Sequence, residues 1–226
     1  MKPAFFLLVI AGLLGLAGCL PVSQNPLSSP EKATADARLA GVWYGKSGED
    51  TIFLHFVAGD TAKMDIVEVD HQKNGDAHTN IYTMFPTVIG DTRFMNVQEK
   101  KGANKSYYLA RYQISTTGSL TIWLMSEKAV TKAIKGEKIS GKVVEKNSAN
   151  GTPDHDVTVT ASTEKLAAFV GKSDPEILFA EKFGTFKKVT LPALEAAATP
   201  KSSPTPAKKN VTPAKSPAKK KRTATQ

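Results

Sequence analysis

Cysteine is almost absent from this chain of 226 residues, which contains only Cys19. A single cysteine has no partner within the chain, so no internal disulfide can form. The signatures of several common enzyme classes are also missing, because there is no H-E-x-x-H, no G-x-S-x-G and no glycine-rich phosphate loop. We therefore expect a protein that is not an enzyme and that uses no cofactor.

No apolar run is long enough for a helix that spans a bilayer, which takes about 20 residues. The run at 5–16 follows Lys2 and leads to the small residues Ala17 and Gly18. A positive start, a short apolar stretch and a small-residue cleavage site are typical of a secretory signal peptide. We assign residues 1–18 to a signal that is removed on export.

Cys19 completes the run Leu16-Ala17-Gly18-Cys19, which resembles the lipobox of bacterial lipoproteins. The resemblance implies cleavage before Cys19, a diacylglyceryl thioether on its sulfur and an acyl chain on its amino group. It also implies an anchor in the cell envelope, at the outer membrane if the source is Gram-negative, because no Asp follows the cysteine. The alternative is a secreted protein with a chance cysteine. Residues 19–37 are rich in Pro, Ser and Ala, and are predicted to be a flexible tether of a folded domain at 38–190.

Acidic and aromatic residues are missing from the end of the chain, 199–226, which holds five prolines. Its eight cations account for all but +1 of the net charge of +9. This composition cannot bury a core, so we predict a disordered tail at 191–226. The cations assigned to contact with anionic polymers are Lys208, Lys209, Lys219, Lys220, Lys221 and Arg222.

Three interpretations of this tail stay open. It is a solvated end with no dedicated partner, or an arm that contacts anionic envelope polymers and lipid headgroups, where each nearby lysine contributes about 1 kcal/mol. Binding to nucleic acid is the third. The export signal disfavours it, and so does the lack of aromatic side chains on which bases could stack.

The central domain has short stretches of alternating polarity separated by turn residues, a pattern typical of antiparallel β-structure. Helices are predicted at 127–134 and at 163–170, the second with Ser162 as its N-cap and Gly171 at its end. A last extended piece follows at 183–189. Nine strands in a row predict a mainly β fold, with a meander that closes into a barrel or folds into a sandwich. These strands are 39–46, 51–58, 63–70, 79–88, 92–100, 106–115, 119–125, 138–146 and 155–161.

Gly41-Val42-Trp43, on the first predicted strand, resembles the Gly-x-Trp signature of lipocalins and their calycin relatives. The order of a meander, a helix and a last extended segment is also similar to theirs, although the disulfides of classical lipocalins are absent. The resemblance implies an antiparallel barrel of eight or nine strands with a C-terminal helix. It further implies that Trp43 plugs the closed end and that Lys187 or Lys188 packs over it.

An eight-stranded barrel is just wide enough to be filled by its own side chains or to hold one small ligand. Both options stay open at this point. If a cavity exists, we predict that Trp43, Met84, Phe94 and Trp123 line it. The first functional hypothesis is a module that binds a small apolar or lipidic ligand. The second is an envelope structural protein, held by lipid at one end and by its basic tail at the other.

The histidines offer two weaker hypotheses. His71 and His78 flank a loop with Asp70 and Asp76, and imidazole and carboxylate groups suit a metal such as zinc. The spacing matches no established pattern, so we predict no metal site. In Asp154-His155-Asp156 two carboxylates could orient an imidazole as a general base, but no nucleophile can be paired with it from the sequence.

Overall fold

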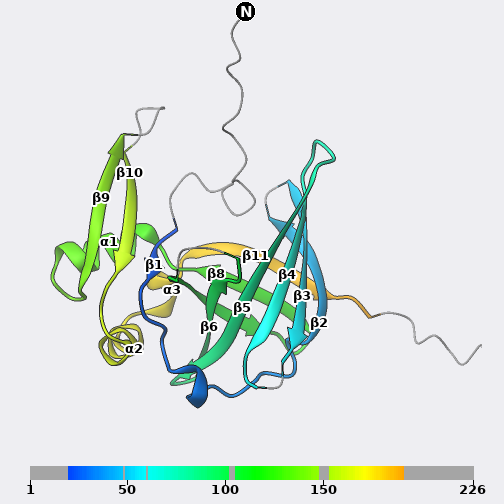
Figure 1. Ribbon diagram of the computed structural model, residues 1–226, viewed down its shortest axis with the longest axis horizontal. Helices are drawn as coiled ribbons and strands as arrows, with labels where there is room; N and C mark the ends of the chain where they lie inside the picture. Colours follow the sequence, from blue (N-terminus) through cyan, green and yellow to red (C-terminus); the bar gives the residue numbers. More distant parts are fainter. Residues whose placement is uncertain (1–19, 48, 60, 102–104, 148–152, 191–226) are drawn as a thin grey trace, which may run out of the picture. The chain divides into compact units, whose positions relative to one another are not determined.

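A closed β-barrel forms the main part of the fold (Figure 1). The computed structural model describes residues 20–47, 49–59, 61–101, 105–147 and 153–190. Eight antiparallel strands close on themselves in the order β2, β3, β4, β5, β6, β7, β8 and β11. The predicted mainly β fold with an antiparallel barrel is therefore confirmed. The strands are β2 (Gly41–Ser47), β3 (Asp50–Ala58), β4 (Met64–His71), β5 (Ala77–Ile89), β6 (Thr92–Glu99), β7 (Tyr107–Ile114), β8 (Ser119–Leu124) and β11 (Glu181–Lys188).

Strand β11 closes the barrel by pairing with β8 on one side and with β2 on the other. The backbones come very close at this seam. A Cβ on Gly45 would lie 2.5 Å from the carbonyl oxygen of Thr185 and 2.8 Å from the ring of Phe186. Glycine is therefore needed at position 45, because the buried Phe186 ring occupies the space that a side chain would take.

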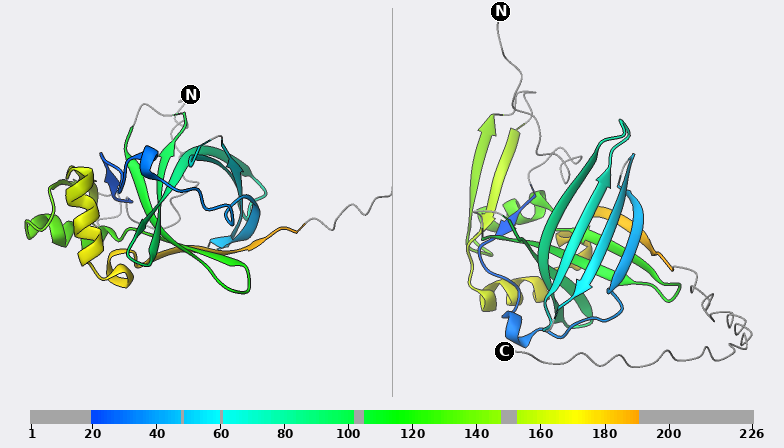
Figure 2. Two further views of the ribbon diagram at one scale, coloured as in Figure 1. Left: turned by 90° about the horizontal axis from the view of Figure 1, so that it is seen from below. Right: turned by 45° about the vertical axis from the view of Figure 1, so that its right-hand side comes forward.

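The eighth barrel strand does not follow the seventh in the sequence. Five elements stand between β8 and β11: α1 (Glu127–Lys135), β9 (Gly141–Asn147), β10 (Pro153–Val159), α2 (Thr163–Lys172) and α3 (Pro175–Leu178). Strands β9 and β10 form a hairpin beside the barrel (Figure 2). The prediction that they continue the meander is wrong, and the last extended segment is the eighth barrel strand instead. Alternating polarity identifies a strand, but it does not say which strand will be its neighbour.

Both predicted helices are present, with one difference at an end. Helix α1 covers the predicted 127–134, and in α2 the side chain of Ser162 accepts a hydrogen bond from the backbone N–H of Lys165. Helix α2 does not stop at Gly171 but continues to Lys172. A glycine near a helix end lowers helix stability without ending the helix. None of the helices in the described ranges has the length and hydrophobicity needed to cross a bilayer.

Alternation along the barrel strands separates two hydrophobic cores. One side of each strand faces the barrel interior, and the other side of β6, β7 and β8 is covered by the inserted elements. The interior core includes Trp43, Leu54, Phe56, Met84, Met95, Tyr112, Leu120 and Phe186. The outer core includes Phe94, Leu109, Val157, Val159, Leu166, Val170 and Phe179.

The segment before the barrel is packed against it, which corrects the predicted flexible tether. Strand β1 (Val22–Ser23) pairs with β7 and with β10, and a 3-10 turn, η1 (Pro30–Lys32), follows. The buried Asn96 of β6 accepts a hydrogen bond from the backbone N–H of Leu27 at 2.7 Å. The side chain of Asn25 donates to the carbonyl of Ala161 at 2.9 Å. We call residues 20–37 the strap. Its polar composition suggested a solvated linker. Its amide groups instead form hydrogen bonds to the barrel and to the elements inserted between β8 and β11.

Candidate functional site

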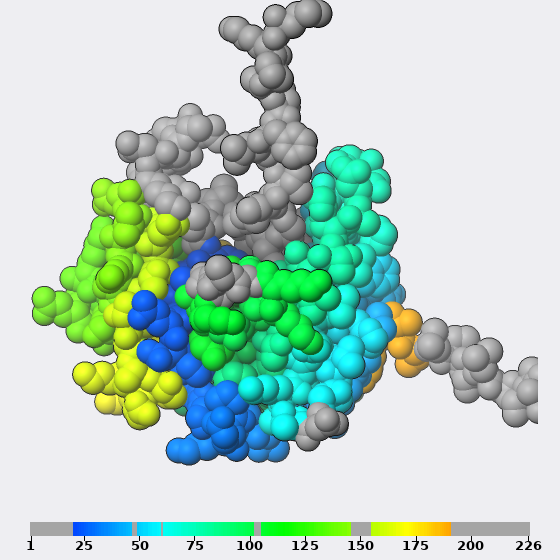
Figure 3. Space-filling model, viewed as in Figure 1, coloured from blue at the N-terminus to red at the C-terminus, as the bar shows by residue number. Residues whose placement is uncertain are grey.

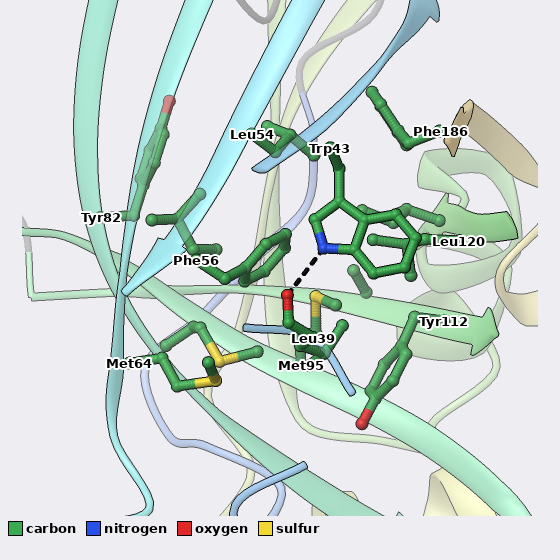
Figure 4. Packing of buried hydrophobic residues seen from close by; sticks show 14 of the residues in the cluster. Leu39, Trp43, Leu54, Phe56, Met64, Tyr82, Met95, Tyr112, Leu120 and Phe186 are labelled. Carbon is green, nitrogen blue, oxygen red and sulfur yellow. Dashed lines mark hydrogen bonds between the residues drawn. The ribbon is translucent and has the colours of Figure 1, made fainter. Parts of the chain in front are cut away.

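Trp43 and its buried neighbours (Figure 4) fill the interior near the end of the barrel at which β2 begins, which we call the closed end. The indole N–H of Trp43 donates to the carbonyl of Leu39 at 2.7 Å, and the ring is buried in the interior core. The ammonium group of Lys188 lies 5.3 Å from the centre of this ring and donates to the carbonyl of Arg38 at 3.1 Å. This matches the packing that the lipocalin resemblance implied, with Lys188 rather than Lys187 in that position.

The backbone conformation at position 41 explains why the Gly-x-Trp run begins with glycine. Its φ is +112°, which favours glycine, and a Cβ there would lie 3.1 Å from Cε of Lys188. A side chain at position 41 would therefore push the lysine away from Trp43. Glycine and lysine together leave the indole ring covered.

A buried carboxylate completes the closed end. Asp36 of the strap pairs with Arg38 at 2.6 Å and accepts a hydrogen bond from the hydroxyl of Tyr112 at 3.0 Å. Hydrogen bonding to Arg38, which outweighs burial, lowers the pKa of Asp36 below its ordinary value. Burial, with the nearby Asp36 charge, raises the pKa of the Tyr112 hydroxyl. This end is thus filled and its polar groups are paired.

The other half of the interior holds a cavity of about 70 Å³. Its surface is apolar, because the lining residues Glu68, Tyr82 and Tyr108 contribute carbon atoms to it and no polar atom. Such a volume admits a short alkyl chain or a few water molecules. The lining residues are Leu54, Phe56, Ile66, Glu68, Tyr82, Met95, Val97, Tyr108, Ala110, Ile122, Leu124 and Phe183.

One lining residue is acidic: Glu68 of β4, which is 1% exposed. Its Oε1 atom is buried and has no hydrogen-bond partner, while Oε2 lies 3.5 Å from the side-chain nitrogen of Asn80. Burial raises the pKa of Glu68 to about 7, although the Tyr82 hydroxyl and the Asn80 amide act in the opposite direction. A buried carboxyl with one unpaired oxygen is costly to maintain, and the raised pKa reflects that cost.

A second acidic side chain lies two residues further along the same strand. Asp70 is also 1% exposed, and its Oδ1 atom has no hydrogen-bond partner. Burial raises the pKa of Asp70, and the charge of Asp50 on β3 acts in the same direction. The inner face of β4 therefore turns from apolar to acidic toward this end of the barrel.

An irregularity in β11 supplies the aromatic part of the lining. The pairing of β11 with β8 shifts between Lys182 and Gly184, which leaves Phe183 out of the ladder. Such a bulge changes the direction of a side chain, and bulges are frequent at barrel rims and binding sites. Here the ring of Phe183 lines the cavity and lies 5.7 Å from the ring of Phe186.

The four predicted lining residues divide into two pairs. Trp43 and Met84 belong to the interior core but do not line the cavity. Phe94 and Trp123 lie on the outer face of the barrel, which corrects the prediction for both. Phe94 packs 5.1 Å from the ring of Phe179, and Trp123 lies under the guanidinium of Arg111 at 4.1 Å.

The residues that sequence reasoning missed are mostly the neighbours of those it chose. Met95, next to Phe94, lines the cavity, and nothing in β6 separates the two by type. On β8 a signal was present, because Leu120, Ile122 and Leu124 alternate with Trp123. Glu68 could not be found this way, since a carboxylate in an alternating strand is ordinarily assigned to the solvent side.

A groove between the inserted helices is another concave region of the described residues. Four lysines surround its apolar floor, and Ile177 in it is 64% exposed. Helices α1, α2 and α3 all contribute to it, and the yellow atoms of α2 lie at the lower left of Figure 3. The lysines are Lys132, Lys138, Lys165 and Lys172, and Glu137 and Asp174 are the acidic residues of the lining.

The histidine hypotheses gain no support from the geometry. Asp70 faces His78 across β4 and β5, whereas His71 stacks its edge against Phe53 with ring centres 5.8 Å apart. Among the described residues there is no group of three or more His, Cys, Asp or Glu side chains placed to hold a metal ion. His155 lies between two glutamates, with Nδ1 3.2 Å from Glu127 and Nε2 3.9 Å from Glu145.

Comparisons with protein-family models, with curated proteins and with solved structures gave no match for this chain. Cys19 and the six tail cations lie outside the residues that the structure describes. The lipid anchor and the contact with anionic polymers therefore stay predictions from the sequence. The site that can be argued from geometry is the cavity beside Glu68.

Proposed function

We propose that this protein is a lipid-anchored, non-enzymatic protein of the cell envelope whose barrel binds one small apolar ligand. The observation that carries the proposal is the apolar cavity of about 70 Å³ in an otherwise filled barrel. Protein interiors are packed like organic crystals, so a void of this size lowers stability unless something occupies it. A ligand that fills the void restores the lost contacts.

The closed end limits the size of the ligand. Trp43, Met84 and Phe186 already occupy that half of the interior. An apolar cavity of about 150 Å³ accommodates benzene, so a smaller void takes a short alkyl chain or the end of a longer one. Phe183 at the bulge is only partly buried, so its movement is the simplest way to admit a larger group.

The binding proposal is tested with the mature chain, residues 19–226, carrying Cys19→Ser so that it stays in solution. We expect 1-hexanol to bind by isothermal titration calorimetry. Ala110→Leu fills the cavity and should weaken this binding at least tenfold, whereas Ala168→Leu on the exposed side of α2 should not. Ile122→Phe serves as a second cavity-filling variant if Ala110→Leu unfolds. Equal affinity in the folded filled variants and the parent would overturn the proposal.

The anchor is a separate part of the proposal and rests on the Leu16-Ala17-Gly18-Cys19 run. We expect the chain expressed in a bacterial host to incorporate a labelled fatty acid and to fractionate with membranes. Cys19→Ser should remove both properties. A cysteine that is found unmodified in the exported chain by intact-mass measurement would refute the anchor and leave the ligand proposal standing.

The envelope-tethering function is the alternative, and the groove between the inserted helices favours it. Its four lysines add positive charge to a domain whose tail is already basic. Binding of the mature chain to purified peptidoglycan or lipopolysaccharide should then fall with salt and with deletion of residues 199–226. Binding that survives both treatments would exclude an electrostatic tether.

A further inference from the structure

The groove between the inserted helices is much larger than the cavity inside the barrel. Its volume is about 980 Å³, which lies at the upper end of the range usual for small-molecule sites, about 300–1,000 Å³. The three helices lie together on one side of the barrel (Figure 2), and small side chains on facing sides of α1 and α2 leave room between them. These floor residues are Ala129 and Ala133 of α1 and Ala168 of α2.

The floor of this groove keeps apolar side chains in contact with water. Ile177 of α3 is 64% exposed, and Phe169 of α2 is only partly buried. Exposed apolar surface with a polar rim is typical of a binding groove. A hydrocarbon chain that covered these side chains would contribute about 25 cal/mol for each Å² removed from water.

Four lysines surround the apolar floor. Lys132 and Lys138 come from the α1 side, and Lys165 and Lys172 from α2. All four are exposed, and within the described ranges none of them forms an ion pair with a carboxylate. A lysine lays its aliphatic stem on apolar surface and keeps its ammonium group in water. These ammonium groups are therefore free to meet an anion at the mouth of the groove.

Two acidic residues, Glu137 and Asp174, also line the groove. The carboxylate of Asp174 is already engaged, because it caps α3 and accepts a hydrogen bond from the backbone N–H of Glu176 at 2.8 Å. Four lysines and two acids leave the lining with a formal charge of +2. An anionic ligand is attracted to such a lining, whereas a cationic one is repelled.

We propose that this groove binds a single-chain anionic amphiphile such as a free fatty acid, with its hydrocarbon chain on the floor and its carboxylate among the four lysines. A wholly polar anionic polymer would leave the floor in water, and a flat bilayer surface cannot enter a concave floor. Helices α1 and α2 have nine and ten residues, so each is about 14 Å long, which suits a chain of medium length. The groove shares no lining residue with the barrel cavity, so this site is independent of the proposed function.

The test titrates dodecanoate into the mature Cys19→Ser chain by calorimetry at pH 8, below the concentration at which dodecanoate forms micelles. We expect saturable binding of one molecule that weakens as salt is added. Dodecyltrimethylammonium, which has the same chain and a cationic head, should bind at least tenfold more weakly. Equal affinities for the two compounds, or no binding of dodecanoate, would overturn the inference.

Variants of exposed residues locate the site. Lys132→Glu combined with Lys165→Glu reverses the charge on both sides of the groove and should weaken dodecanoate binding at least tenfold. The matched control combines Lys128→Glu with Lys142→Glu, exposed lysines of α1 and β9 that do not line the groove, and it should keep the affinity. Ile177→Ser removes an apolar contact without a change of charge and should weaken binding several-fold. Unchanged affinity in the folded groove variants would contradict the proposed site.

Two further outcomes separate this site from other modes of binding. Ala110→Leu, which fills the barrel cavity, should leave dodecanoate binding unchanged. If it abolishes binding and the groove variants do not, the ligand lies in the barrel, so the inference is wrong and the proposed function stands. If the groove lysines are needed for binding to vesicles of an anionic phospholipid while dodecanoate does not bind, the groove is a membrane contact and the inference is again wrong.

Discussion

The inward-facing residues of β4 change from Met64 and Ile66 to Glu68 and Asp70. The first two pack in the interior core, whereas the carboxyl groups each keep one oxygen without a partner. Burying an ionised group without compensation costs several kcal/mol, so such residues respond by holding a proton. The raised pKa of Glu68, about 7, is that response.

A pH dependence of stability follows from this single residue. Glu68 releases its proton near pH 4.5 when unfolded and near pH 7 when folded, so the folded state binds more protons between these values. The free energy of unfolding must then fall as pH rises through this window and stay level above it. For this group we expect a loss of about 2 kcal/mol between pH 5 and pH 8.

Urea unfolding of the parent chain and of Glu68→Gln at several pH values measures this contribution. The stability of Glu68→Gln relative to the parent should increase steadily from pH 5 to pH 8. The control is Glu164→Gln on α2, which removes an exposed carboxyl whose backbone hydrogen bond lowers its pKa; it should run parallel to the parent over this range. A Glu68→Gln difference that stays constant with pH would show that Glu68 is not buried as described.

At the scale of elements, local patterns predicted the strands well and their partners poorly. The stretches at 51–58 and 119–125 are β3 and β8, because alternation of Ile, Leu and Phe with polar residues reports one buried face. The same alternation could not show that 138–146 and 155–161 pair outside the barrel. That outcome depends on tertiary contacts, such as the pairing of β10 with β1, which is distant in sequence.

The candidate site shows the same limit. The burial of Trp43 beneath Lys188 was expected because a three-residue signature carried it, whereas its assignment to the cavity lining was wrong. Phe94 was assigned to the wrong face because Phe94, Met95 and Asn96 are all buried, so β6 has no solvent side there to fix the register. The covering strap removes the polarity contrast on which the prediction depends.

Asn96 is the residue through which the strap is held on β6. Its side chain accepts from the N–H of Leu27 and donates to the hydroxyl of Thr87 at 2.8 Å and to the carbonyl of Phe85 at 3.2 Å. Asn96→Ala leaves these buried groups without partners, and we expect it to lower the free energy of unfolding by about 2–3 kcal/mol. The amide of Leu27 should also exchange with solvent much faster, as hydrogen-exchange mass spectrometry or NMR would detect.

A matched control is Gln113→Ala, on the exposed side of β7. It should change stability by less than about 0.5 kcal/mol, which is usual for surface positions. If Asn96→Ala lowered stability but left exchange at Leu27 unchanged, the strap would be held by other contacts, such as those of Asn25 and Ser28 with the insertion and β5.

At the scale of the whole molecule, the packed strap determines the orientation that a lipid-anchored barrel would take relative to the membrane. Leu20, the residue after Cys19, packs against the interior core. Two residues later β1 pairs with Tyr107 and Tyr108, and Tyr108 lines the cavity. No flexible segment therefore separates the proposed lipid from the barrel. A tether of 18 free residues would have allowed any orientation within about 25 Å of the bilayer.

We therefore predict that the lipidated protein holds the Glu68 end of the barrel nearer to the bilayer than the Trp43 end. The two ends carry hairpins that suit a comparison, with Asn74 between β4 and β5, and Asp91 between β5 and β6. Lipidated Cys19 leaves no free thiol, so Asn74→Cys or Asp91→Cys adds a single site for a fluorescent label. In vesicles with quencher-bearing lipids, the label at position 74 should be quenched more strongly than the label at position 91.

The Cys19→Ser chain with either label is the control and should show no quenching at all, since it has no anchor. Quenching that is equal at the two positions would mean that the strap detaches when the lipid inserts, and Asn96→Ala would then change nothing. Stronger quenching at position 91 would contradict the predicted orientation directly. A gradient that disappears in Asn96→Ala would instead show that the strap fixes the barrel with the cavity end facing the bilayer.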